Sequence, residues 1–276
     1  MKKRIVCALL ALIMLVSLVP ATAITAAAAT NSVSESVITV LKSLEKYDRY
    51  CDANGYIGYG TKCTGEGEHD GNHEMYEKDA DKALREMLAK LSTAVNDFAA
   101  KYGLALSQAQ HDALVLFSFE NGTAWTTGTG DLQTAIRNRS TGTEFLDAIC
   151  KWNYGTADDF RRMIEANMYL NGVYNTSVPS RFIWVELDVG AGTMREDSLQ
   201  YFDVVSTTTV DIVPTPNDEK ATFLGWYFTN EDGNLERVTK LTKDHKGLTL
   251  EAQYQGERDT ETASSYTIRR YEKPQR

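Results

Sequence analysis

The stretch of sequence that decides the fold reads Leu41-Lys-Ser-Leu-Glu-Lys-Tyr47, then Tyr50-Cys-Asp-Ala-Asn-Gly55 and Tyr56-Ile-Gly-Tyr-Gly-Thr61. Its first part completes a run, beginning at Val37, in which apolar residues recur at helical intervals. The remainder is rich in Gly, Tyr and Asn, which is the composition of turns and short strands. The stretch therefore predicts a short amphipathic helix followed by a small β-lobe over residues 50–76.

Outside this lobe, the chain up to Gly172 is predicted to be mainly helical. Two pairs with capping-box spacing, Ser32/Glu35 and Ser107/Gln110, mark the beginnings of the first and third helices. Apolar positions from about 78 to 102 keep a 3.6-residue period, and Gly103 supplies a stop. Shorter helices are expected over residues 132–137, 143–151 and 158–170, with Gly172 closing the last.

Beyond Pro179 the apolar period changes from 3.6 to 2. The segments 183–189 and 248–254 alternate in this way, which predicts strands. Between them lies an aromatic run, and strand geometry places its side chains in two pairs on opposite faces. The expected pairs are Leu224 with Trp226 and Phe223 with Tyr227.

Composition fits a globular protein of two modest domains, since the 276 residues are 42% hydrophobic and 24% charged. The periodicities predict an α+β protein with a mainly helical domain over 30–178, a small β-rich module over 181–255 and a polar tail over 256–276. The formal charge is -9, which excludes bulk electrostatic attraction to nucleic acid or an anionic membrane surface.

Residues 1–29 have the layout of a secretory signal peptide: a basic start, an apolar run and an Ala-rich end. No other stretch approaches the roughly 18 apolar residues that are needed to span a bilayer. We therefore expect a secreted or cell-surface protein that has no membrane contact once the signal is removed.

The cysteines that remain after signal removal are Cys51, Cys63 and Cys150. Export permits one disulfide, which would join Cys63 to one of the other two, and three reduced thiols are an equally open alternative. The scattered thiols do not predict a metal site, and His69 and His73 among acidic residues indicate a solvated loop. No metal or cofactor is expected.

Two carboxylates are the candidates for chemistry. Glu45 lies four residues after Leu41, on the margin of the apolar helical face, and half-burial predicts a raised pKa and a proton to donate. Asp52 lies in the polar Gly-rich segment, where it should stay ionised. Glycoside hydrolysis requires two carboxylates in unlike environments. A helix-end Glu and a turn Asp without chemistry are the alternative interpretation.

Three segments, in the same order, resemble the phage-type lysozymes, glycoside hydrolase family 24. The opening stretch matches the family's helix-borne Glu, its Tyr-x-Asp and its Ile-Gly-Tyr-Gly element. Residues 110–119 resemble its Gln-Phe-Asp-Ala-Leu segment, and residues 152–169, with Arg161-Arg162-x-x-Glu165, resemble its closing helix. The resemblance covers about residues 32–174 and implies a lysozyme-like fold, peptidoglycan glycan strands as substrate and no cofactor.

The resemblance also implies roles for individual residues. Glu45 takes the role of the general acid that protonates the glycosidic oxygen, and Asp52 takes that of the second carboxylate. Tyr56, Tyr59 and Arg162 are candidates for contacts with the substrate. Core packing for the tyrosines and a local ion pair for Arg162 are the alternatives.

This chain departs from the family pattern at three positions beside those residues. Lys46 follows Glu45 where the family has Gly. Tyr56 stands where the family has Thr or Ser, and Thr61 lies on the other side of the Ile-Gly-Tyr-Gly element. Glu120 replaces the family's Asn, which adds a carboxylate close to the expected cleft.

Residues 182–255 resemble a bacterial surface repeat, the internalin-type B-repeat. This resemblance implies a β-grasp-like spacer or interaction module through which the protein would contact a cell surface. The aromatic residues at its centre are interpreted as core, and nothing in the module indicates catalysis.

The leading hypothesis is a secreted muramidase that cleaves the β-1,4 bond between N-acetylmuramic acid and N-acetylglucosamine. The alternative is a catalytically weak or inactive protein that binds cell-wall glycan or serves in surface interactions. The missing Thr equivalent, Glu120 and the acidic charge motivate the alternative.

Overall fold

The computed structural model describes residues 30–63, 73–153 and 159–256. The expected signal peptide, His69 and the tail beyond residue 256 lie outside the described residues. Contacts divide the chain into two compact units. The first comprises the residues up to Ser140 together with Phe160–Ser177, and the second comprises Thr141–Asp159 together with the residues from Val178 onward.

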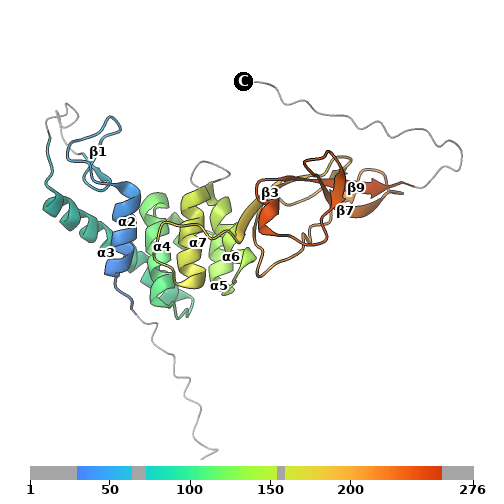
Figure 1. The fold of residues 1–276 in the computed structure, drawn as a ribbon. Coiled ribbons are helices and arrows are strands. Elements are labelled where there is room, and N and C mark those ends of the chain that lie inside the picture. The colour runs from blue at the N-terminus through green and yellow to red at the C-terminus, as the bar shows by residue number, and fades with distance from the viewer. Residues whose placement is uncertain (1–29, 64–72, 154–158, 257–276) are drawn as a thin grey trace, which may run out of the picture. The chain divides into compact units, whose positions relative to one another are not determined.

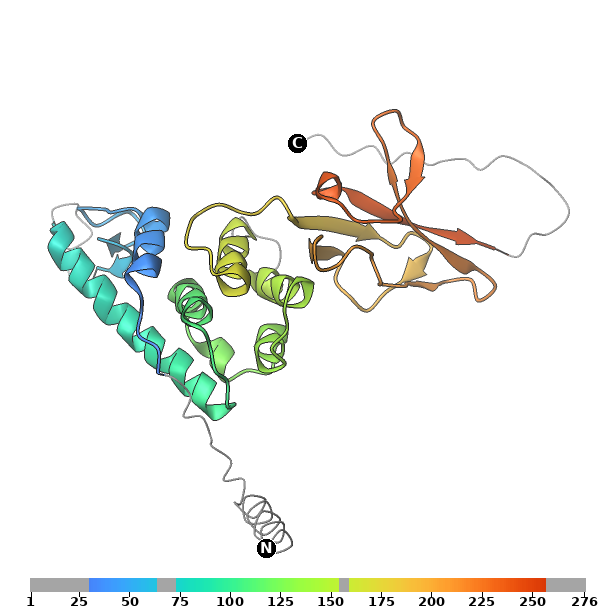
Figure 2. The same ribbon diagram turned by 60° about the horizontal axis from the view of Figure 1, so that its bottom comes forward.

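The first unit is mainly helical, as predicted (Figure 1). Its elements are α2 (Glu35–Glu45), α3 (Glu77–Lys101), α4 (Gln108–Asn121), the short 3-10 helix η1 (Ala124–Thr126), α5 (Asp131–Arg137) and α7 (Asp159–Asn171). Figure 2 shows α3 along its full length. The predicted stops are confirmed, because Gly103 and Gly172 follow α3 and α7 with φ of 61° and 67°. The capping box of Ser107 and Gln110 is also confirmed.

The predicted start of the first helix is wrong by two residues. The N-cap is Ser34, whose hydroxyl accepts the Val37 N–H at 3.3 Å, and the predicted capping box of Ser32 does not form. Ser32 is held elsewhere, since its carbonyl accepts a 2.7 Å hydrogen bond from the Gln108 side chain on α4. This contact over 76 residues keeps the segment before Ser34 outside the helix.

One buried carboxylate, that of Asp112 on α4, joins three segments of the first unit. Its Oδ1 accepts hydrogen bonds from the Ser34 backbone at 3.3 Å and from Gln108 at 3.0 Å. Its Oδ2 accepts the Tyr174 hydroxyl at 2.8 Å. The start of α2, the start of α4 and the segment after α7 are thus tied to a single side chain.

The β-lobe is a short antiparallel hairpin of β1 (Tyr56–Ile57) and β2 (Thr61–Lys62). Gly58 has a φ of 69°, and a Cβ at this position would lie 2.9 Å from the Ala80 Cβ on α3, so the hairpin can approach α3 only with glycine there. A disulfide joins Cys51 to Cys63 across 12 residues, and Cys150 is buried outside it. Of the pairings left open by the sequence, the structure has Cys51 with Cys63.

The second unit is built on a five-stranded mixed sheet in the order β5-β3-β9-β7-β8. Its strands are β3 (Phe182–Asp188), β5 (Leu199–Asp203), β7 (Thr222–Thr229), β8 (Leu235–Arg237) and β9 (Thr249–Gln255). β3 and β9 are parallel and the other pairs are antiparallel. A separate two-stranded pair joins β4 (Gly192–Thr193) to β6 (Thr215–Pro216). With the helical first unit, this sheet confirms the α+β class.

Three helical elements also belong to the second unit: α6 (Thr143–Cys150) and the 3-10 helices η2 (Lys151–Asn153) and η3 (Lys243–His245). α6 packs on β5, where the Asp147 carboxylate accepts the Tyr201 backbone N–H at 3.0 Å. Burial raises the pKa of Asp147, although its hydrogen bonds and Lys151 oppose this.

The predicted pairing of aromatic side chains on β7 is wrong. Trp226 is in the core, Phe223 packs against it with ring centroids 5.5 Å apart, and Leu224 is exposed. The cause is a register shift between Phe223 and Gly225, where Gly225 has a φ of 139°. An extra residue in one strand reverses the alternation of faces beyond it, so two residues three apart share the core side.

Candidate active site

Glu45 is the last residue of α2, and its side chain is 19% exposed. The position on the margin of the buried face agrees with the sequence prediction. Its Oε1 lies 2.5 Å from Nη1 of Arg161 on α7. A charge-assisted contact across 116 residues thus fixes the carboxylate at the end of its helix.

The backbone turns sharply directly after this carboxylate. Lys46 has φ 61° and ψ 171°, a region that is essentially limited to glycine because of the Cβ of other residues. This is the position at which the resembling family has Gly. The turn carries the chain from α2 toward the β-lobe, so a strained residue is adjacent to Glu45.

Arg161 lies between three carboxylates. Besides Glu45, its Nη1 lies 3.0 Å from Oε2 of Glu120 on α4, and its Nε lies 3.6 Å from Oε1 of Glu165. Burial lowers the pKa of the guanidinium, but the carboxylates, with Glu45 first, more than compensate and raise it. The Arg161 side chain is 14% exposed, so its charge depends on these neighbours.

Arg162 and Glu165 form a second ion pair on the same helix. Nη2 of Arg162 lies 2.8 Å from Oε1 of Glu165, and both side chains are fully buried. The Arg162 guanidinium also lies 5.0 Å from the centroid of the Phe117 ring. Burial raises the pKa of Glu165 to about 8 despite both arginines. Of the two adjacent arginines, Arg161 is the one that reaches Glu45.

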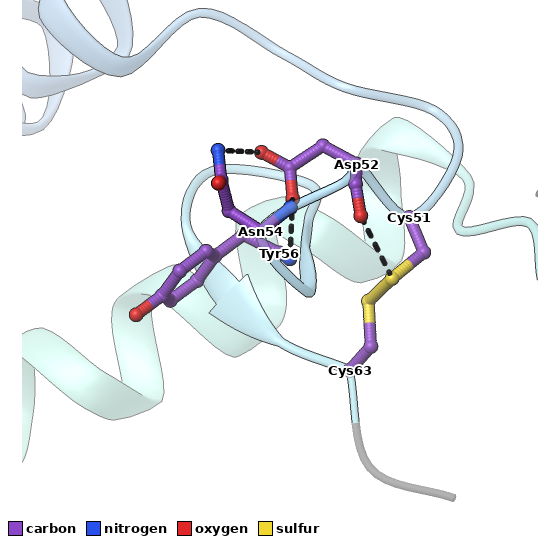
Figure 3. Close-up of a disulfide and its surroundings, with 5 residues drawn as sticks. All are labelled: Cys51, Asp52, Asn54, Tyr56 and Cys63. Carbon is purple, nitrogen blue, oxygen red and sulfur yellow. Dashed lines mark hydrogen bonds between the residues drawn. A yellow bond between two sulfur atoms is a disulfide. The ribbon is translucent and has the colours of Figure 1, made fainter. Parts of the chain in front are cut away.

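Asp52 caps its own turn in the β-lobe (Figure 3). Its Oδ1 accepts the backbone N–H groups of Asn54 at 2.9 Å and of Tyr56 at 2.8 Å. These bonds, with that from Tyr56 foremost, lower the pKa of Asp52, so the carboxylate is ionised, as the sequence predicted. The neighbouring Cys51–Cys63 disulfide closes the same lobe.

The two tyrosines of the lobe are in different environments. Tyr56 is 46% exposed on β1, and its ring points away from the disulfide in Figure 3. Tyr59 is 5% exposed, and its hydroxyl donates to Oε1 of Glu77 at 2.8 Å. Burial raises the pKa of Tyr59 to about 12, and the Lys42 ammonium lies 4.9 Å from its ring centroid.

The hairpin turn approaches Glu45 through Gly60. A Cβ on Gly60 would lie 3.9 Å from Oε2 of Glu45 and 3.3 Å from Cζ of Phe119. The structure thus brings Glu45 together with Gly60, Arg161 and Glu120. Within the described residues, no hydrogen bond or ion pair joins Asp52, Tyr59 or Arg162 to Glu45.

Local sequence patterns did not predict the contact between Arg161 and Glu45. The spacing of Arg161 to Glu165 predicts only an ion pair along α7, and nothing local links it to a helix 116 residues earlier. The available signal was the resemblance of the Arg-Arg-x-x-Glu segment to the family's closing helix.

In residues 30–63, 73–153 and 159–256, no group of three or more His, Cys, Asp and Glu side chains is arranged to hold a metal ion. The helices in these ranges include none with the length and apolar character to cross a membrane.

In a comparison with known protein families, residues 42–165 match the phage lysozyme family. The matched span includes Glu45, Asp52, Glu120 and Arg161. No curated protein matches the sequence. The match confirms the lysozyme domain that the motifs predicted and, with it, the enzyme class, a glycoside hydrolase of the lysozyme (muramidase) type.

Solved structures with similarity to the chain include the muramidase domain of SpmX from Asticaccaulis excentricus, with 26% identity and a TM-score of 0.44 over 51% of this chain and 99% of that one. A mutant of P22 lysozyme has 22% identity and a TM-score of 0.41 over 50% and 98% of the two chains. The endolysin of Escherichia coli O157:H7 phage FAHEc1 has 22% identity and a TM-score of 0.39 over 52% and 96%.

Proposed function

We propose that this chain, whose residues 42–165 match phage lysozymes, is a secreted muramidase with Glu45 as the general acid. It hydrolyses the β-1,4 bond between N-acetylmuramic acid and N-acetylglucosamine of peptidoglycan. The observation that carries this proposal is the position of Glu45: half-buried at the end of α2, beside Arg161 and against the hairpin turn.

The surroundings of Glu45 support the role of a proton donor. Its side chain is 19% exposed, which leaves a face for the glycosidic oxygen while water is largely excluded. A general acid must be able to deliver its proton to the leaving oxygen, and the exposed part of Glu45 lets a substrate oxygen reach its carboxyl group.

Asp52 is proposed as the second carboxylate, which stabilises the oxocarbenium-like transition state or positions a water. Its hydrogen bonds from the Asn54 and Tyr56 backbone hold it ionised and fix its direction. A negative charge that needs no reorganisation is what electrostatic stabilisation requires.

The expected substrate-binding residues are proposed to act in two ways. Tyr56, with 46% of its surface exposed next to the Asp52 turn, contacts the glycan directly. Tyr59 and Arg162 are buried and support the site indirectly. Tyr59 fastens the lobe to α3 through Glu77, and Arg162 holds Glu165 beside Arg161.

The test is reducing-end release from purified peptidoglycan by the chain that begins at Thr30, between about pH 4 and 8. Glu45→Gln should abolish release while the fold is retained, because the amide cannot donate the proton. The matched control is Glu86→Gln, which removes a carboxylate 64% exposed on α3 and should leave release unchanged. Full activity of Glu45→Gln would exclude Glu45 as the acid.

Asp52→Asn separates charge from turn capping. The amide oxygen can still accept the two backbone N–H groups, so the lobe should keep its structure while release falls. Asp52→Ala removes both functions and should also loosen the turn, as measured by hydrogen exchange of the Tyr56 amide. Unchanged release by Asp52→Asn would refute its electrostatic role.

The alternative function, a glycan-binding protein with little turnover, is favoured by one observation: the ion pair of Glu45 with Arg161. A carboxylate held by a guanidinium has no proton to donate. This alternative predicts that the folded chain sediments with peptidoglycan without releasing reducing ends, and failure to sediment would exclude it.

A further inference from the structure

Arg161 contacts two carboxylates with one nitrogen. Its Nη1 lies 2.5 Å from Glu45 and 3.0 Å from Glu120, and the three residues come from α7, α2 and α4. Glu120 is the residue at which this chain departs from the Phe-Asn of the resembling family. The carboxylate of this unusual residue therefore contacts the same guanidinium that holds Glu45, the proposed acid.

A general acid that is paired with arginine must leave that pair when it takes up its proton. Protonation of Glu45 removes the nearest negative charge from a guanidinium that is 14% exposed. A buried charge without a partner is strongly disfavoured. Arg161 stays charged at any pH of interest, so protonated Glu45 requires another counter-charge nearby.

The other carboxylate near Arg161, that of Glu165, is a poor replacement. Its Oε1 is 3.6 Å from Nε of Arg161 but 2.8 Å from Arg162, which is fully buried and has Glu165 as its ion-pair partner. Glu120 contacts the Nη1 that Glu45 would release, and its side chain is 39% exposed, so water also reaches its carboxylate.

We propose that Glu120 is a positioning residue that retains Arg161 when Glu45 carries the catalytic proton. The inference rests on the proposed role of Glu45 as the general acid. Glu120 has two effects, and both favour the form of Glu45 that carries the proton. It supplies the alternative partner for Arg161, and its own negative charge favours the neutral form of Glu45.

The groups near Glu45 come from α7, α4, the hairpin and α2 itself. α7 contributes Arg161, with Glu165 behind it, and α4 contributes Glu120. The hairpin contributes the uncharged Gly60. On α2 itself, Lys42 is paired with Asp81 on α3 at 2.5 Å. Glu120 is thus the negative group that shares the Arg161 nitrogen with Glu45.

The test is Glu120→Gln, which removes the charge and preserves the shape. Carbon-13 NMR of the Glu45 carboxyl carbon reports the pH at which Glu45 is half-protonated, and this pH should fall by about one unit. The alkaline limb of reducing-end release should shift with it, a roughly tenfold loss above the limb. Release at the acidic plateau should stay within about twofold of the unchanged chain, and the Glu86→Gln control should shift neither quantity.

An unchanged half-protonation pH in Glu120→Gln overturns the inference. Loss of release at every pH with an unchanged Glu45 titration also overturns it, because Glu120 would then take part in the chemistry directly. The NMR readout does not need turnover. A chain without hydrolytic activity would therefore refute the proposed muramidase function, while the titration would still decide the role of Glu120.

Discussion

Nη2 of Arg162 lies 2.8 Å from Oε1 of Glu165, and neither side chain is exposed. A guanidinium and a carboxyl group are thus held inside the helical unit, next to the carboxylates around Arg161. Desolvation of such a pair cancels most of its attraction, whereas removal of one partner leaves a buried charge. The intact pair therefore adds little to the stability of the fold, whereas removal of one partner should destabilise it strongly.

Removal of Glu165 alone should be severe. We expect Glu165→Leu to lower the free energy of unfolding by about 3–5 kcal/mol, because Arg162 cannot lose its charge. The double variant with Arg162→Met should recover most of this loss. Urea denaturation measures both, and a single variant as stable as the double one would contradict the prediction.

Glu165 should also make stability depend on pH. Burial raises its pKa from 4.5 to about 8 in the folded chain, so between these values the folded state holds a proton that the unfolded state releases. The contribution is fully present below about pH 4.5 and is lost as the pH rises through 8. Its size is on the order of a few kcal/mol. In Glu165→Gln, the decrease of unfolding free energy over this pH range should become smaller; an identical pH dependence would contradict this.

Lys46→Gly should stabilise the helical unit by about 1 kcal/mol, because φ 61° and ψ 171° strain any residue with a Cβ. Lys46→Ala keeps the Cβ and serves as the control, with little change expected. Chemical denaturation of both variants checks the difference. Equal stability of the two variants would show that the backbone at this position is not strained.

Removal of the disulfide should loosen the β-lobe selectively. Closure of the 12-residue separation between Cys51 and Cys63 contributes roughly 2–3 kcal/mol by restricting the open chain. In the double Ser variant, amide exchange of Tyr56 should accelerate and reducing-end release should fall, because the Asp52 turn lies between the two cysteines. Helix content, measured by circular dichroism, should be unchanged. Simultaneous loss of helix content would mean that the lobe does not open alone.

Much of the helical unit follows from local chemistry. The 3.6-residue period defines α3, and the glycines at 103 and 172 end their helices because they adopt positive φ. The start of α2 was not predictable in this way, since the Ser32 carbonyl is bound by Gln108 on a distant helix. The faces of β7 were mispredicted because the bulge before Gly225 depends on pairing with β9.

In the candidate site, too, some features follow from local sequence and others depend on contacts between distant residues. From the sequence, Glu45 could be placed at the margin of the buried face of its helix and Asp52 in a polar turn, and the structure has both there. The contact of Glu45 with Arg161 spans 116 residues, and helical spacing carries no information over that distance. Likewise, Tyr56 and Tyr59 lie three residues apart in a Tyr-rich segment, and only packing against α3 distinguishes the exposed ring from the buried one.

The Asp112 carboxylate also bears on how the chain folds. It joins Ser34 near one end of the helical unit to Tyr174 near the other, and residues 141–159 between them belong to the second unit. During synthesis, this junction cannot close until residue 174 has emerged. A contact between distant positions forms only after the chain between them has lost the conformational entropy of loop closure, and this slows folding. The helical unit should therefore remain incomplete until late in translation, and its first segment should acquire protection from exchange only after α7 has docked.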